Sequence, residues 1–415
     1  MPDHQLHDNR DGSGRAGVSR RSLLFGGAAA GAGAAVALAA DRVGVLPASR
    51  EVELDAAGLN GARTLPFHGT HQAGIATPIA AHASYVALDL HADTDADALG
   101  RMMRLLSDNA ARLAQGRGAL ADTEPELAES PAALTVTFGF GPELVRRAGG
   151  ASAVPTWLAP LPPFSIDALE DRWNGGDLLL LVSSDDAVTT AHAVRMLLKD
   201  SRAFAQVRWR QDGFRRAYGS QVSGTTMRNL FGQIDGTTNP EPGTAEFDKV
   251  VWSSDRWLAG GTSLVIRRTR LDLDTWDEVD PVARGFSVGR RFSDGAPLTG
   301  DREADEPDFD ARNAAGLTVI SPVAHIARAR PVEDHEVIFR RSYNYDVEPS
   351  GDSVSESGLI FASFQADVTR QFLPIQTRLA EVDLLNTWTT PVGSAVFAIP
   401  PGCAEGGFIG DTLLA

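Results

Sequence analysis

The segment Ser84-Tyr85-Val86-Ala87-Leu88-Asp89-Leu90 is rich in β-branched, aromatic and aliphatic residues and predicts a β-strand. It is followed by residues 95–116, in which apolar side chains recur at the spacing of an amphipathic helix. The residues of that stripe are Leu99, Met102, Leu106, Ala110 and Leu113. A strand followed at once by an amphipathic helix is the first unit of an α+β or α/β fold.

The same alternation continues through the chain and appears twice. In the first half it predicts strands at 134–140, 177–182 and 207–209 and a helix at 187–204. In the second half it predicts strands at 263–270, 336–345, 358–365 and 395–400 and a helix at 368–388. Two such units predict an α+β protein of two ferredoxin-like halves, antiparallel sheets with helices, at 41–225 and 226–415. The acidic stretch 301–310 is expected to be a solvated surface loop.

The N-terminal segment has the features of an export signal. Ser19-Arg20-Arg21-Ser22-Leu23-Leu24-Phe25 precedes a Gly/Ala-rich apolar run at 26–40, and Ala37-Leu38-Ala39 offers a small-residue cleavage site. Twin arginines before a weakly hydrophobic run indicate the bacterial twin-arginine route, with a general secretory signal or a membrane anchor as alternatives. The run is short for a membrane span and poor in Leu and Ile. We therefore expect a signal peptide at 1–40 and an extracellular, periplasmic or cell-envelope location.

Composition excludes several classes of function. The 415 residues carry a formal charge of −16, so the basic surface of a nucleic-acid-binding protein is not expected. No segment after the signal predicts a stable membrane span, and the oligomeric state is left open. Cys403 is the single cysteine, which excludes an intramolecular disulfide and an iron–sulfur cluster.

One carboxylate stands in a distinctive setting. Gly232-Gln233-Ile234-Asp235-Gly236-Thr237-Thr238-Asn239-Pro240 places Asp235 between glycines and turn-forming residues. Turn chemistry alone accounts for such a sequence. The functional alternative is a buried carboxylate that moves a proton between two oxygens, with glycines that let the backbone approach a flat cofactor.

A histidine and an arginine later in the chain could complete a site. His325 lies in Ala324-His325-Ile326 after an apolar run, and a lone histidine of this kind is either structural or a metal ligand. Arg328 and Arg330 would suit anionic groups of a cofactor, or equally a solvent-facing edge. Arg340 lies within a predicted strand next to Arg341, so alternation places the two on opposite faces.

Several motifs together resemble the dye-decolourising peroxidase family, in particular its exported, iron-import-associated branch. The resemblance covers about 64–413 and rests on the following segments: Phe67-His68-Gly69-Thr70-His71-Gln72-Ala73-Gly74-Ile75, 134–141, Arg228-Asn229-Leu230-Phe231-Gly232-Gln233-Ile234-Asp235-Gly236-Thr237, Ala324-His325-Ile326, Ile338-Phe339-Arg340-Arg341, Gly358-Leu359-Ile360-Phe361 and Glu405-Gly406-Gly407-Phe408-Ile409-Gly410. It implies that the two ferredoxin-like halves form a dimeric α+β barrel-type fold, with the cofactor site in the second half.

The resemblance also implies roles for individual residues. His325 would be the proximal ligand of the iron of haem b, Asp235 the distal acid/base and Arg340 the distal cation. Asp383 would accept the other N–H of the proximal histidine, although a carboxylate on a helix surface is an equally good interpretation. The further cofactor contacts that it implies are Gly236, Thr237, Arg328, Arg330 and Phe361.

The implied activity is peroxidase chemistry. Hydrogen peroxide would react through an oxoferryl intermediate, and dyes, phenols or other bulky reductants would then be oxidised. Two alternatives stay open at this stage. One is a haem-binding or iron-release component of an iron-uptake system, similar to a deferrochelatase, and the other is an exported binding protein that shares only the scaffold.

Overall fold

The structure is a computed structural model that describes residues 58–349, 351 and 353–414. The predicted signal at 1–40 and the lead-in at 41–55 lie outside the described residues. Residues from Asp55 onward form one compact unit, so the boundary expected at 225/226 stays a prediction. In the described residues, no helix is both long enough and apolar enough to cross a membrane.

The first half has the predicted ferredoxin-like arrangement. Its strands are β1 (His82–Leu90), β2 (Thr135–Phe140), β3 (Leu178–Ser184) and β4 (Ala205–Phe214). Its main helices are α2 (Ala96–Ala114), which follows β1, and α4 (Ala187–Ser201), which follows β3, and a shorter α3 (Pro142–Gly149) follows β2. The strands pair antiparallel in the order β4-β1-β3-β2. Helices α2 and α4 pack their apolar stripes on one face of this sheet.

The second half repeats that order. Its strands are β7 (Thr262–Leu271), β9 (Tyr343–Val347), β10 (Glu356–Gln365) and β11 (Thr389–Ile399), arranged as β11-β7-β10-β9. A two-residue strand, β8 (Phe339–Arg340), also pairs with β10. A separate hairpin is formed by β5 (Met227–Arg228) and β6 (Ile234–Asp235). The helices are α5 (Ala245–Val251), α6 (Leu273–Asp277), α7 (Pro281–Val288), α8 (His325–Ala329), α9 (Leu373–Val382) and α10 (Asp411–Leu414).

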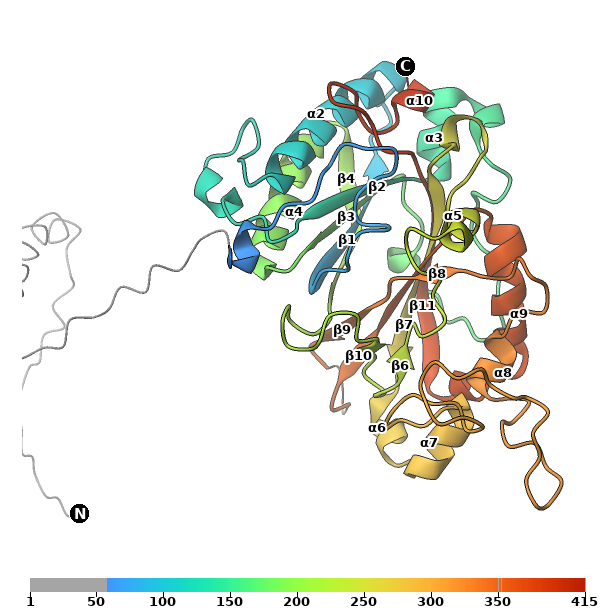
Figure 1. The fold of residues 1–415 in the computed structure, drawn as a ribbon. Helices are drawn as coiled ribbons and strands as arrows, with labels where there is room; N and C mark the ends of the chain where they lie inside the picture. Colours follow the sequence, from blue (N-terminus) through green and yellow to red (C-terminus); the bar gives the residue numbers. More distant parts are fainter. Residues whose placement is uncertain (1–57, 350, 352, 415) are drawn as a thin grey trace, which may run out of the picture. The chain divides into compact units, whose positions relative to one another are not determined.

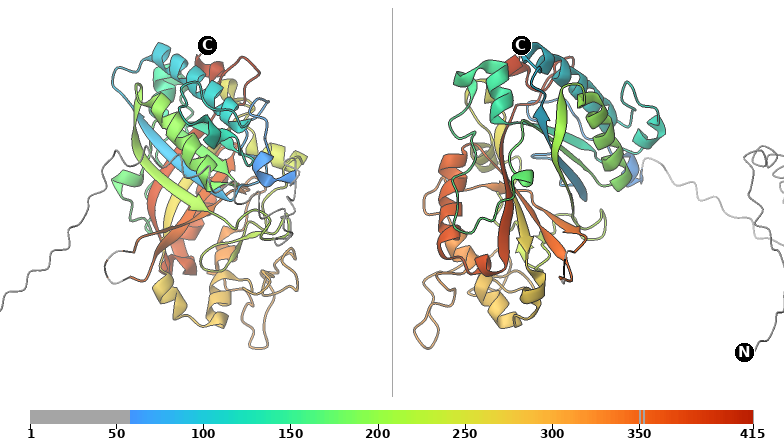
Figure 2. Two further views of the ribbon diagram at one scale, coloured as in Figure 1. Left: turned by 90° about the vertical axis from the view of Figure 1, so that its left-hand side faces the viewer. Right: turned by 180° about the vertical axis from the view of Figure 1, so that it is seen from behind.

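The two sheets join edge to edge into a closed ring of strands, with helices on the outside (Figures 1 and 2). Each of the two seams between the halves is a single residue pair. Phe140 of β2 pairs with Ala398 of β11, and Phe214 of β4 pairs with Asn344 of β9. The predicted fold class, two ferredoxin-like halves in an α+β barrel, is confirmed.

Strand alternation divides the apolar side chains between the inside and the outside of the ring. Tyr85, Ile266, Phe339 and Phe364 belong to a core cluster inside the ring. Neighbouring residues such as Val265 belong to the cluster beneath the outer helices. In the second half, α8 and α9 lie along the outer side (Figure 1).

Two of the predicted elements are wrong in their extent. The strand expected at 336–345 is two strands, because the chain bends at Arg341 and Ser342 between β8 and β9. The helix expected at 368–388 begins as a π-helical turn at Val368–Phe372 and ends at Val382, and a 3₁₀ turn follows at Leu384–Thr387. The apolar periodicity continues through both breaks, so sequence spacing could not reveal them.

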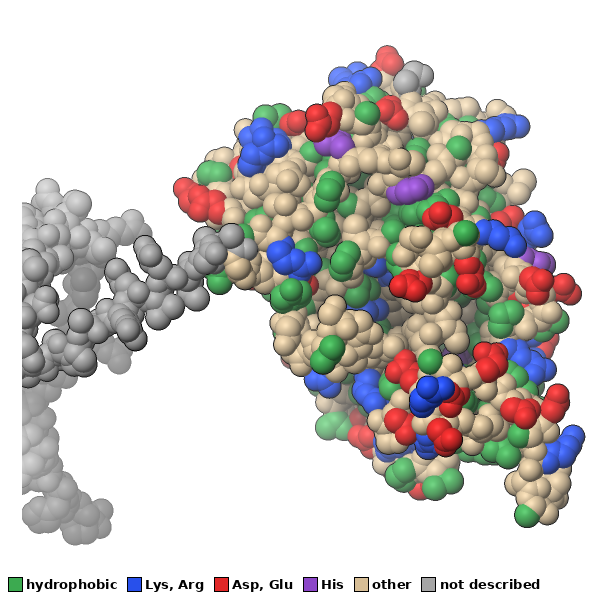
Figure 3. Space-filling model, viewed as in Figure 1, with side chains coloured by type: hydrophobic (Ala, Val, Ile, Leu, Met, Phe, Trp, Pro, Cys, Tyr) green, Lys and Arg blue, Asp and Glu red, His purple; other side chains and the backbone are tan. Residues whose placement is uncertain are grey.

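The face in Figure 3 shows acidic and basic side chains interspersed, most densely where Figure 1 places α6, α7 and the loops that precede α8. The acidic residues of this region are thus partly neutralised by neighbouring arginines, of which Arg302 with Asp305 is one example.

Gln72 secures the seam between β2 and β11. Its buried amide accepts a hydrogen bond from Phe138 N–H and donates to the carbonyls of Phe138 and Pro400. We predict that Gln72→Leu lowers the free energy of unfolding by about 3 kcal/mol, because buried backbone groups lose their partners. Denaturant unfolding measures this, with the exposed Gln115→Leu as a control expected to change it by less than about 0.5 kcal/mol. Equal effects of the two substitutions would contradict the proposed role of Gln72.

Candidate active site on the outer face of the second half

Asp235 and Arg340 form an ion pair on the outer side of the second half. Asp235 ends β6, and its Oδ1 lies 3.1 Å from Nη1 of Arg340 on β8. The residue after Asp235 is Gly236, with φ of +122°, a backbone conformation that other residues adopt only with strain. The chain therefore turns away directly after the carboxylate.

Asn239 fixes the backbone of Arg340. Its side-chain nitrogen donates to Arg340 O at 2.7 Å, and its oxygen accepts from Arg340 N at 3.1 Å. Nη2 of Arg340 also donates to the hydroxyl of Thr238 at 3.3 Å. The sequence predicts Asn239 only as a turn former. Its place in the Gly232–Pro240 motif is the one feature of the sequence that indicates a role near Asp235.

His325 and Asp383 form a second pair. His325 is the first residue of α8, and its Nδ1 lies 2.6 Å from Oδ2 of Asp383. Asp383 is not on a helix surface, because α9 ends at Val382 and the backbone of Asp383 is extended. Its other oxygen accepts from Leu385 N–H and begins the 3₁₀ turn. The break in the helix thus turns a 94% buried carboxylate toward the histidine.

The charge of Asp383 sets the protonation of the His325 ring. Burial disfavours the imidazolium, but the charge and hydrogen bond of Asp383 outweigh it, so the pKa of His325 is raised. The positive charge of Arg340 opposes this rise and the negative charge of Asp235 adds to it. These two contributions are smaller than those of burial and Asp383, and they oppose each other.

Several residues of this part of the second half suit a flat cofactor. The His325 side chain keeps 32% of its surface accessible, so part of the ring is not covered by other residues. Arg340 on β8 lies opposite Ser363 on β10, whose buried hydroxyl has no partner among the described residues. Phe361, two residues from Ser363, shares that outer face and contacts Phe372. A half-accessible imidazole, an orphaned hydroxyl and an aromatic ring fit a haem whose iron takes one protein ligand.

Three of the other predicted cofactor contacts have side-chain partners within the protein. The Thr237 hydroxyl donates to Glu303 at 2.9 Å. The guanidinium of Arg328 donates to Arg378 O and to Glu381 on α9. Arg330 stacks over the Phe309 ring. Within the described part of the chain, no hydrogen bond or ion pair links Arg328 or Arg330 to His325, so their expected role toward propionates stays a prediction.

Comparisons with known proteins show the family of the chain. Residues 72–215 match the family model described as Dyp-type peroxidase, N-terminal, and residues 226–404 match Dyp-type peroxidase, C-terminal. The chain is 36% identical to a dye-decolorizing peroxidase of Thermobifida fusca, over 96% of this chain and 98% of that protein. The chain belongs to the Dyp-type peroxidase family. It is accordingly a haem peroxidase, an oxidoreductase that uses hydrogen peroxide to oxidise dyes, phenols and other bulky reductants.

Solved structures of Dyp-type peroxidases share the fold. One from Cellulomonas bogoriensis is 50% identical, with a TM-score of 0.83, and covers 86% of this chain and 99% of its own. Ferric DtpA from Streptomyces lividans is 39% identical, with a TM-score of 0.82, over 85% of this chain and 98% of its own. A deferrochelatase of Escherichia coli strain K12 is 31% identical over 84% of this chain and 87% of its length.

Helix α8 of this Dyp-type peroxidase is clamped to α9 by reciprocal arginine contacts. Arg378 of α9 donates to the carbonyls of Arg328 and Arg330, while Arg328 donates to the carbonyl of Arg378. Arg378 also pairs with the buried Glu336 at 2.8 Å, and Glu336 accepts from Val332 N–H. These contacts hold the helix that begins with His325 against the helix that ends before Asp383.

Glu336 makes these contacts between α8 and α9 dependent on pH. Burial works to raise the pKa of Glu336, but hydrogen bonds from Val332 and Arg378 outweigh it, so the pKa is lowered. A carboxyl with a lowered folded-state pKa stabilises above its unfolded pKa of about 4.3 and loses that stability as pH falls through the folded value.

We predict that Glu336→Gln costs about 2 kcal/mol of unfolding free energy at pH 7 and progressively less below about pH 4. Denaturant unfolding at several pH values measures the difference from the wild type. The exposed Glu333→Gln in the same loop is the control and should show no such trend. A cost for Glu336→Gln that stays constant down to pH 3 would contradict the assignment.

Proposed function

We propose that this chain is an exported haem b peroxidase with His325 as the iron ligand and Asp235 and Arg340 as the groups that act on peroxide. The observation that carries the proposal is the arrangement of two polar pairs. His325 pairs with Asp383 at 2.6 Å and Asp235 pairs with Arg340 at 3.1 Å, and the four residues come from different elements of the second half. A ligand with its carboxylate partner and an acid/base with its cation are what peroxide cleavage at a haem requires.

His325 and Asp383 would serve the iron side. Because Asp383 accepts the hydrogen bond from Nδ1, the Nε2 atom of His325 is left to bind a metal. The carboxylate makes the imidazole more basic and orients its ring. When bound, the haem supplies the iron that binds peroxide and takes up its two oxidising equivalents. Gly236, Thr237 and Phe361 would border the cofactor, as would Arg328 or Arg330 if their side chains turned.

Asp235 and Arg340 would serve the peroxide side. An ionised Asp235 accepts the proton from one oxygen of hydrogen peroxide and returns it to the other, which leaves as water. Arg340 orients the Asp235 carboxylate through their 3.1 Å contact and stabilises the negative charge that develops as the O–O bond lengthens. Its backbone anchor to Asn239 holds the guanidinium for this task.

We also propose the alternative activity of iron release as a secondary function of the same site. Its support is the 31% identity to deferrochelatases, which also favours the iron-import-associated branch of the family. To distinguish peroxidase activity from iron release, the haem-loaded protein is incubated with and without peroxide and then analysed for free porphyrin and ferrous iron. Recovery of intact haem alone would exclude iron release.

His325→Ala is expected to abolish haem retention, because the protein would lose its iron ligand. The measurement is the Soret band after haem reconstitution and gel filtration. His335→Ala, in the loop after α8, is the control and should retain haem like the wild type. Unchanged spectra for His325→Ala would refute the ligand assignment.

Asp235→Asn is expected to keep haem but to slow the reaction with peroxide at least about 100-fold, the usual contribution of a positioned acid/base. Stopped-flow mixing with peroxide, followed in the Soret region, gives the rate. Arg340→Leu in the same experiment shows which of the two groups carries more of the catalysis. The exposed Asp310→Asn is the control, and equal rates for Asp235→Asn and the wild type would exclude Asp235 as the base.

We propose export by the twin-arginine route on the strength of Ser19–Phe25 and the apolar run that follows. Replacement of Arg20 and Arg21 by lysine should leave the protein in the cytoplasm of a host with that route. Fractionation measures this, and export of the lysine variant at the wild-type level would contradict the proposal.

A further inference from the structure

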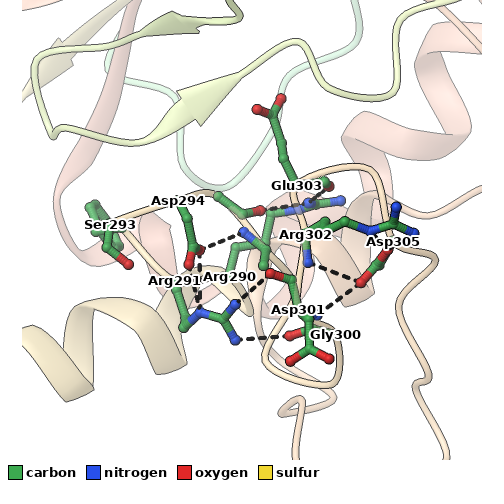
Figure 4. Close-up of polar contacts among 12 residues, drawn as sticks. Arg290, Arg291, Ser293, Asp294, Gly300, Asp301, Arg302, Glu303 and Asp305 are labelled. Carbon is green, nitrogen blue, oxygen red and sulfur yellow. Dashed lines mark hydrogen bonds and ion pairs between the residues drawn. The ribbon is translucent and has the colours of Figure 1, made fainter.

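A folded loop lies against the hairpin that carries Asp235. Residues 290–305 contain tight turns closed by Arg291 N–H to Ala296 O and by Gly295 N–H to Arg291 O. The Arg291 guanidinium donates to the carbonyls of Gly300 and Asp301. Figure 4 shows Arg290 and Arg291 and the backbone carbonyls to which they donate, within one group of polar contacts. The stretch 301–310, expected as solvated surface only, is therefore structured at its start.

Arg290 fixes the main chain of Glu303. The buried guanidinium of Arg290 donates through Nη1 to the carbonyls of Gly295 and Glu303, both at 2.8 Å. Burial lowers the pKa of Arg290, and the nearby Glu303 charge opposes that change. The backbone of Glu303 is thus tied to the base of the loop, which leaves its side chain to make contacts elsewhere.

The Glu303 carboxylate bridges the two ends of the hairpin. Its Oε1 accepts hydrogen bonds from the hydroxyl of Thr226 at 2.7 Å and from that of Thr237 at 2.9 Å. Thr226 immediately precedes β5, and Thr237 follows β6 by two residues. The β5–β6 ladder itself has only two residue pairs, too few to hold a hairpin rigid in water.

The loop also touches the hairpin beside Asp235. A Cβ atom added at Gly295 would lie 2.6 Å from Cδ1 of Ile234, and the φ of +76° at Gly295 also favours glycine, so the loop approaches the hairpin closely here. Arg228, on β5, donates to the carbonyls of Gly232, Phe292 and Ser293, which ties the hairpin to the loop from the other side. The hairpin is therefore held by the loop as well as by its own ladder.

We infer that Glu303 is a positioning residue for the peroxide reaction, which sets the orientation of Asp235 through Thr226 and Thr237. The inference rests on the proposed role of Asp235. Glu303 contacts neither Asp235 nor Arg340 in the structure, so it acts through the hairpin. Without the bridge, Gly236 and Thr237 are free to shift, and the Asp235 carboxylate loses its fixed direction relative to Arg340.

The test compares Glu303→Ala with Glu303→Gln, which keeps an oxygen acceptor for the two threonines. Thr226→Val removes one of the two hydrogen bonds to Glu303. It tests the same bridge independently if Glu303→Ala fails to fold. Glu306→Ala, an exposed position in the same loop, is the matched control. Hydrogen exchange of the 232–239 segment is measured on the haem-free proteins, and the rate with peroxide is measured on the haem-loaded proteins.

We expect several-fold faster exchange in 232–239 for Glu303→Ala and a smaller increase for Thr226→Val. We expect Glu303→Ala to react with peroxide about 10-fold more slowly, because a small misplacement of a catalytic group slows a reaction by about this much or more. The rate of reductant oxidation should stay unchanged. Glu303→Gln and Glu306→Ala should stay within about 2-fold of the wild type in both measurements.

The inference would be overturned if hydrogen exchange in 232–239 were the same in Glu303→Ala as in the wild type. It would also be overturned if exchange were faster but Glu303→Ala reacted with peroxide as fast as an active wild type. A slow peroxide step in Glu303→Gln, with normal exchange, would also overturn it, because the charge would then act without the hairpin. A wild-type protein that binds haem but does not react with peroxide would contradict the proposed function. Exchange in the haem-free proteins would still show whether Glu303 orders the hairpin.

Discussion

The hydrogen bond between His325 and Asp383 depends on the end of a helix. If α9 continued through the 3₁₀ turn, as the apolar periodicity suggests, Asp383 would project with its helix neighbours and could not meet the first residue of α8. The extended backbone at Asp383 allows one carboxylate oxygen to cap the next turn and the other to accept from the histidine. One residue therefore ends a helix, starts a turn and sets the basicity of the ring.

The outer faces of the two similar halves are covered by different helices. In the first half, α2 and α4 run the length of the sheet and bury its outer face under continuous apolar stripes. In the second half, the corresponding face is covered by a shorter α9 with a π-helical start and by the single-turn α8. Side chains such as Arg340 and Ser363 can thus remain on that face without displacing core residues. The same topology thus gives an apolar layer in one half and a face that carries polar side chains in the other.

The sequence predicted the repeated strands and long helices well, because each has an uninterrupted apolar pattern. The family resemblance, more than local chemistry, predicts one site for Asp235, His325, Arg340 and Asp383, and the structure shows two pairs, Asp235 with Arg340 and His325 with Asp383. The bend between β8 and β9 was not predictable from pattern, since apolar residues continue on both sides of it. The roles of Asn239 and Glu303 were not predictable either. Each depends on a partner far along the chain, Arg340 in one case and the threonines of the hairpin in the other.

The single-pair seams have a consequence for how the chain acquires its structure. Phe140 and Ala398 are paired although 258 positions separate them (398 minus 140), so the ring closes only after the last strand has been made. Until then, β2 and β4 are open edges of a finished four-stranded sheet, with unpaired backbone groups that can recruit other strands. Contacts of such long sequence separation form slowly. A nascent or truncated first half is therefore the stage at which this protein is most exposed to aggregation.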